Sequence, residues 1–185
     1  MIVSTKEDRR SWRATPPLLD VYTSDANDLV AFVQNASKDD LTVFNVVHGF
    51  AAEVPLFEAV LNHPDLDRAT ALTIFHACNP AFYENEISNG TPEADLALDE
   101  EDAIVLAILD MAHNRLVNGP SMTSRYAAKC LAEWEKFPHV SPARFKRWPL
   151  CSLAMAKTDG LHPNPYVAYD DTKIRLSFDV WQGRH

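Results

Sequence analysis

The densest group of side chains that could do chemistry runs from His63 to Asp67 and is followed by His76. His63, Asp65, Asp67 and His76 are imidazole and carboxylate groups, which could hold a divalent metal ion and activate a bound water. Their spacing matches known ligand patterns only loosely. In the competing interpretation, Pro64 breaks one helix and Asp65 or Asp67 caps the next. A metal-assisted hydrolase is therefore kept only as the alternative function, and no cofactor is expected.

Other candidate catalytic groups are isolated in the sequence. Glu84 and Glu86 could form a pair of carboxylates, but they fall in a polar segment where exposed acids are the rule. Cys78 lies late in an apolar helix face and suits an inert buried thiol, although a histidine partner from elsewhere in the chain stays open. No group defines catalytic residues, so the sequence leans towards a protein without enzymatic activity.

Charge is divided unevenly along the chain, which has 185 residues and a formal net charge of −9. The segment Asp39–Asp110 holds fifteen acidic residues and one basic residue, Arg68, for a net charge of −14. The segment Arg115–Lys157 holds eight basic residues and two acidic ones, for +6. Either the two segments face each other inside the fold, or an acidic face meets a basic partner.

Four consecutive acids, Asp99, Glu100, Glu101 and Asp102, stand where the strongest predicted helix begins. Acidic side chains interact favourably with the dipole at the first turn of a helix, so part of this cluster has a structural cause. The functional hypothesis is that these four residues bind a basic protein partner. The favoured function is thus a non-enzymatic binding protein of the immunity, inhibitor or adaptor type.

A smaller basic cluster comprises Arg144, Lys146 and Arg147 beside Phe145 and Trp148. Phosphate contacts could use such residues, but a short basic helix more often solvates a surface and packs an aromatic anchor. Nucleic acid is therefore an unlikely partner.

Apolar residues recur mostly with helical spacing, which predicts a mainly α fold, a multi-helical bundle. The central, buried helix is expected over about 99–118, because 103–109 is apolar almost all round and Gly119-Pro120 stops it. Residues 81–98 are expected to form a loop with short ordered pieces, because 88–92 contains turn residues. The other helices are predicted from Ser24 through Val33, from Asp39 or Asp40 to Gly49, from Pro55 to Pro64, from Asp67 to Asn79, from Ser124 to Lys136, and briefly from Ser141-Pro142.

The C-terminal part changes to a period of two, which indicates strands. Ile174, Leu176, Phe178 and Val180 alternate with polar residues, and 166–169 is also β-prone. The sequence therefore predicts a C-terminal β-hairpin packed against the bundle, since a two-stranded ribbon is barely stable alone. Residues 1–185 are expected to form one domain, with 1–20 as a loosely ordered leader.

Cysteine usage and the absence of targeting patterns suggest a cytoplasmic protein. The three cysteines, Cys78, Cys130 and Cys151, are odd in number and form no C-x-x-C pair, which suits reduced thiols. The N-terminus lacks the apolar region of a secretory signal, and no apolar run approaches the ~20 residues of a membrane span. We expect no membrane partner, and no oligomeric state is predicted.

The stretch from Val54 to Phe75 resembles an uncharacterised bacterial family, a domain of unknown function. The resemblance rests on the Asn62–Asp67 break and on the Thr70–Phe75 helix, and it covers roughly residues 39–83. Where the family pattern has a Trp-Asp-Asp-Gly-like sequence, this chain has Val47-His48-Gly49-Phe50. The resemblance implies a bacterial, cytoplasmic, helical domain and transfers no catalytic residue. Small acidic domains of this kind sometimes serve as immunity proteins, by analogy of fold.

Overall fold

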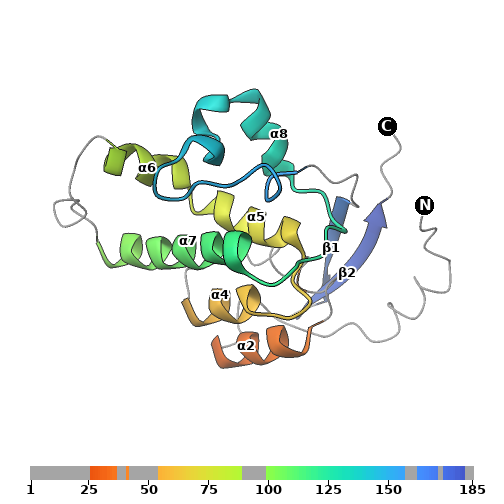
Figure 1. Ribbon diagram of the computed structural model, residues 1–185. Helices are drawn as coiled ribbons and strands as arrows, with labels where there is room; N and C mark the ends of the chain where they lie inside the picture. The colour runs from red at the N-terminus through yellow and green to blue at the C-terminus, as the bar shows by residue number, and fades with distance from the viewer. Residues whose placement is uncertain are drawn as a thin grey trace.

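The computed structural model describes residues 26–36, 41, 54–88, 99–156, 162–170 and 173–181 (Figure 1). This part of the chain is mainly helical, as predicted. The leader over 1–20 and the predicted helix ending at Gly49 lie outside the described residues, apart from Leu41, which is buried. The helices are α2 (Ala26–Asn35), α4 (Val54–Leu61), α5 (Arg68–Ala77), α6 (Pro80–Ser88), α7 (Glu100–Asn118) and α8 (Lys129–Lys136), with short 3₁₀ turns at Pro138–Val140 and Pro142–Arg144.

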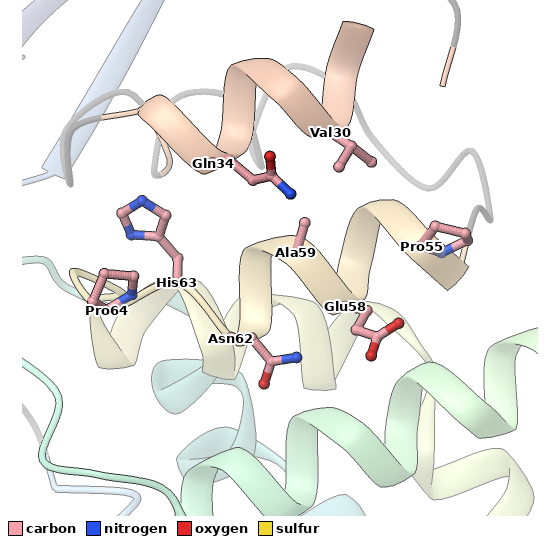
Figure 2. Close-up of a pocket in the computed structure, with 8 residues that line it drawn as sticks. All are labelled: Val30, Gln34, Pro55, Glu58, Ala59, Asn62, His63 and Pro64. Carbon is pink, nitrogen blue, oxygen red and sulfur yellow. The ribbon is translucent and has the colours of Figure 1, made fainter. Parts of the chain in front are cut away.

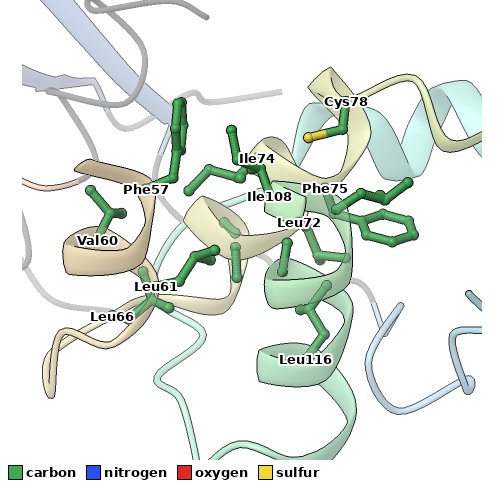
Figure 3. Close-up of a cluster of buried hydrophobic side chains, with 14 of the residues drawn as sticks. Phe57, Val60, Leu61, Leu66, Leu72, Ile74, Phe75, Cys78, Ile108 and Leu116 are labelled. Atoms are coloured by element: carbon green, nitrogen blue, oxygen red, sulfur yellow. The ribbon is translucent and has the colours of Figure 1, made fainter. Parts of the chain in front are cut away.

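The helices pack in the spatial order α2, α4, α7, α5 and α8 (Figure 1). Helix α6 continues from the end of α5. The core lies between α5 and α7, where Ile74 and Phe75 lie near Ile108 (Figure 3). These three residues and Leu109 have no exposed surface. Burial of each such side chain contributes about 1.5–3 kcal/mol to the free energy of unfolding. The contact between α5 and α7 therefore helps to set the positions of the other helices.

Helix α7 has the bounds expected for the central helix, but the prediction that it is covered on every side is wrong. Leu106, Ile108 and Leu109 are buried, whereas Ala103 is exposed and Ile104 is half-buried. Among the described elements, α4 and α5 cover one side of α7. The outer side of α7 carries small and polar residues between the apolar ones, so this side can face solvent.

The expectation of a loop is wrong for residues 81–88, because α6 occupies Pro80–Ser88, and the remainder of that segment, 89–98, lies outside the described residues. Asn79 has a positive φ of 49°, which ends α5 and turns the chain. Pro80 then starts a new helix, a position where its missing N–H costs nothing. Ser88, the first of the turn residues, is the last residue of α6.

Helix α8 begins at Lys129, later than the predicted Ser124. The preceding segment is held extended, because Thr123 forms a parallel bridge with Asp67. The short helix expected at Ser141-Pro142 is a single 3₁₀ turn, and the Ser141 side chain makes no capping hydrogen bond.

Two strands occupy the C-terminal part, β1 (His162–Asp170) and β2 (Lys173–Trp181). They pair antiparallel, with His162 opposite Trp181 and Asp170 opposite Lys173. The side chains of both strands lie outside the described set, so the packing of this hairpin against the bundle stays a prediction. Among the described residues, no helix combines the length and apolar character needed to cross a bilayer.

Candidate functional site

Asp67 is a structural carboxylate, not a metal ligand. It is buried, and its Oδ1 accepts the N–H of Ala69 at 2.9 Å, which caps α5 as predicted. Its Oδ2 accepts the hydroxyl of Thr123 at 2.8 Å and the N–H of Arg125 at 2.7 Å. Both oxygens therefore serve the fold, and they join the start of α5 to the segment before α8.

The other predicted ligands point to different partners. His63 Nδ1 accepts the N–H of Asp65 at 3.1 Å. His76 Nε2 lies 2.9 Å from Glu133 on α8, and its ring packs edge-on against Trp134. No group of three or more metal-binding side chains exists among the described residues, which include all four predicted ligands.

The structure thus does not bring the four residues of the alternative metal site together, and the reason is helix geometry. A helical rise of 1.5 Å per residue puts Asp67 and His76 at opposite ends of α5, about 13 Å apart along its axis. The interpretation as helix punctuation explains Asp67 fully. The hydrolase alternative loses the cluster on which it depended.

Glu84 links the acidic and basic segments of the chain. This carboxylate lies on α6 and is only 6% exposed, contrary to the expectation of an exposed acid in a loop. Its Oε1 accepts the N–H of Lys146, and its Oε2 accepts the N–H of Arg147 at 3.1 Å. The side chain thereby fixes the backbone of the basic cluster.

Asp110 on α7 holds the same cluster from the other side. Its Oδ1 accepts the indole N–H of Trp148 at 2.6 Å, and its Oδ2 lies 3.3 Å from the guanidinium of Arg147. That guanidinium lies over the Trp148 ring, 4.7 Å from its centre. Phe145 and Trp148 are buried anchors. In this region the acidic and basic segments do face each other.

The acidic helix start is built differently. Asp99 Oδ1 accepts the N–H of Asp102 at 2.9 Å, and Asp102 Oδ2 accepts the N–H of Asp99, which completes a capping box. The hydroxyl of Tyr83 donates to Asp102 Oδ1 at 2.7 Å. Burial, followed by this bond and the charge of Asp102, raises the pKa of Tyr83.

Between these two aspartates, Glu100 and Glu101 are exposed to solvent on the first turn of α7. Neither forms an ion pair within the part of the chain that the structure describes. The four predicted partner-binding residues thus divide into two that build the helix start and two that face outwards. The arrangement presents two carboxylates at a rigid position.

A pocket of about 450 Å³ lies between α2 and α4 (Figure 2). Val30 and Gln34 reach into it from α2, Ala59 from α4, and the His63 ring lies at one end. Glu58 also lines it. Sequence reasoning missed this pocket, because its two walls lie in different segments and only packing brings them together.

Two of the three thiols are buried and chemically quiet. Burial raises the pKa of Cys78 to about 12 and that of Cys130 to about 12. The Cys130 thiol donates to the Leu72 carbonyl at 3.8 Å. Cys151 is exposed. A thiolate is the reactive form, so the buried position of Cys78 argues against the nucleophile that the sequence left open.

Comparison with known proteins yields no match: no family model, no curated protein and no solved structure resembles the chain significantly. The resemblance of residues 39–83 to a bacterial family of unknown function stays a prediction.

Proposed function

We propose that this chain is a non-enzymatic binding protein that meets a basic protein partner through the acidic start of α7. Its mode of action would be that of an immunity, inhibitor or adaptor protein in the cytoplasm. The observation that carries this proposal is the exposure of Glu100 and Glu101 on a helix start that Asp99 and Asp102 cap.

The position of these two glutamates favours binding. A capped first turn restricts the backbone, so this chain loses less conformational freedom when it binds a partner. The N–H of Asp102 is already bonded to Asp99, and the carboxylates of Glu100 and Glu101 are exposed. Lysine or arginine side chains of a partner would gain charge-assisted hydrogen bonds there.

Carboxylates that are bonded within the chain support this assignment. Asp67, Glu84 and Asp110 belong to the same acidic segment, yet each is bonded to the segment 115–157. They explain part of the charge partition without any partner. Glu100 and Glu101 are not explained in this way. The buried, unpaired Cys78 and Cys130 support a reducing compartment.

The experiment is a comparative co-purification from host lysate with the full chain as bait. The double variant Glu100→Lys/Glu101→Lys is compared with the wild type and with Asp65→Lys/Glu135→Lys, which changes the charge equally at exposed positions elsewhere. We expect one basic protein with the wild type and the control at about 50 mM salt, and its loss with the α7 variant and at about 500 mM. Equal retention by all three baits would refute the proposal.

A further inference from the structure

The groove between α2 and α4 differs from the acidic start of α7, because it combines an apolar floor with polar groups. Val30 and Ala59 are half-buried and face each other across it, and Gln34 lies on its α2 side (Figure 2). Its volume of about 450 Å³ falls within the ~300–1,000 Å³ typical of ligand sites. The groove therefore has room for large apolar side chains of a bound molecule.

His63 supplies a directed donor at one end of this groove. The residue is 7% exposed, and its Nδ1 accepts the N–H of Asp65, so that nitrogen carries no proton. The neutral ring must then carry its proton on Nε2. No partner for Nε2 is found among the described residues. A donor that lines a groove and has no partner among the described residues is available to an acceptor such as a peptide carbonyl.

The charge of the groove favours a positively charged occupant. Glu58 is exposed and lines the groove, and helices α2 and α4 contain no lysine or arginine. A cationic group placed there would meet an attractive potential with no opposing charge from either wall. Grooves between two helices are a recurring docking place for amphipathic helices.

We infer that the α2–α4 groove docks an amphipathic basic segment of a partner protein. Apolar side chains of the segment enter between Val30 and Ala59, a lysine or arginine meets Glu58, and a backbone carbonyl accepts from His63 Nε2. The inference rests on the proposed function in one respect, the basic character of the partner. It adds a second contact, which provides shape complementarity and buries apolar surface. The α7 carboxylates provide neither.

The test uses the full chain, with fluorescence anisotropy of a labelled Leu/Lys peptide of about 18 residues, long enough to form a helix. A peptide of the same composition, scrambled to remove the apolar stripe, is the matched probe. We expect the amphipathic peptide to bind at least about tenfold more tightly, because only it can bury a continuous apolar face.

Three variants locate the binding. Glu58→Lys should weaken the amphipathic peptide about tenfold, by removing an attraction and adding a repulsion, whereas Glu100→Lys should weaken it by less than about threefold. Gln34→Trp fills the groove from an exposed position and leaves the net charge unchanged, and it should also weaken binding about tenfold. Thermal unfolding confirms that each variant is folded.

Two outcomes would overturn the inference. Equal weakening by Glu58→Lys and Glu100→Lys would show diffuse attraction to an acidic protein. An unchanged affinity for Gln34→Trp would show that the peptide lies elsewhere. Neither outcome affects the co-purification test of the α7 carboxylates, so failure of the groove and failure of the proposed function are distinguishable.

Discussion

Two sets of carboxylates from one acidic segment behave in opposite ways. Asp67 and Glu84 are buried and accept backbone N–H groups from residues 58 to 63 positions further along the chain. Glu100 and Glu101 lie on the surface at the start of α7. The difference shows that net charge along a sequence does not measure the charge available to a partner.

The physical basis of this division is the cost of an unsatisfied buried group. A buried backbone N–H without an acceptor costs about 1–3 kcal/mol. An interior carboxylate that satisfies two or three such donors is therefore committed to the fold. An exposed glutamate contributes little to stability, so its carboxylate remains free to interact with a partner.

The largest effect is expected from Asp67→Ala. The substitution leaves the N–H groups of Ala69 and Arg125 and the hydroxyl of Thr123 without their acceptor, and the free energy of unfolding should fall by about 3–5 kcal/mol. Urea denaturation followed by circular dichroism measures this loss. Asp67→Asn keeps one acceptor oxygen and should lose about half as much. A loss below about 1 kcal/mol would contradict the structural role.

The second-largest loss of stability is expected from Glu84→Gln. The carboxamide keeps one acceptor and turns an NH₂ donor towards a backbone N–H, which should lower the free energy of unfolding by about 2 kcal/mol. Glu86→Gln, half-buried on the same helix, is the matched control and should stay within about 0.5 kcal/mol of the wild type. If both variants were equally stable, the link between α6 and the basic cluster would be disproved.

Tyr83→Phe tests the support of the acidic helix start. Loss of the hydrogen bond to Asp102 should lower the free energy of unfolding by about 1 kcal/mol near neutral pH. The variant should also change the pH dependence. Burial and Asp102 raise the pKa of Tyr83 in the folded state above its unfolded value, which is about 10.

The direction of this pH dependence follows from the linkage between proton binding and folding. Below pH 10 the hydroxyl is protonated in both states, and its full contribution to stability is present. Above that pH the unfolded chain loses the proton first, so the stability of the wild type falls as pH rises towards the folded pKa. Urea denaturation at pH 8 and pH 10.5 should show a steeper decline for the wild type than for Tyr83→Phe. Parallel declines would contradict the assignment.

The smallest effect on stability is expected at the surface. Glu100→Gln/Glu101→Gln removes only a favourable interaction with the dipole of α7 and should cost less than about 1 kcal/mol in total. The loss should disappear in high salt. A loss as large as that of Glu84→Gln would place these glutamates among the structural carboxylates and break the comparison.

Local signals in the sequence predicted much of the helical frame. Asp99 and Gly119-Pro120 mark the two ends of α7, and Asp67 marks the start of α5, because capping residues act on their own backbone. Helix α6 was missed because the turn residues after it obscured a helix that starts at Pro80.

The tertiary partners could not be predicted from the same signals. Asp67 bonds to Thr123 and Arg125, which are 56 and 58 residues away. Glu84 accepts from Lys146 and Arg147 across a similar distance in sequence. Only the packing of α5, α6 and α7 brings such groups together, and the α2–α4 groove has the same origin. The acidic start of α7 was predictable because its four residues are contiguous.

The role of Glu100 and Glu101 in binding is tested by the affinity of the purified chain for the basic protein that it retains, measured by calorimetry across salt concentrations. The affinity of the wild type should fall at least about tenfold between 50 and 500 mM salt. The Glu100→Lys/Glu101→Lys variant should bind weakly at every concentration. An affinity that is independent of salt, or equal for the two proteins, would show that the acidic start of α7 is not the binding surface.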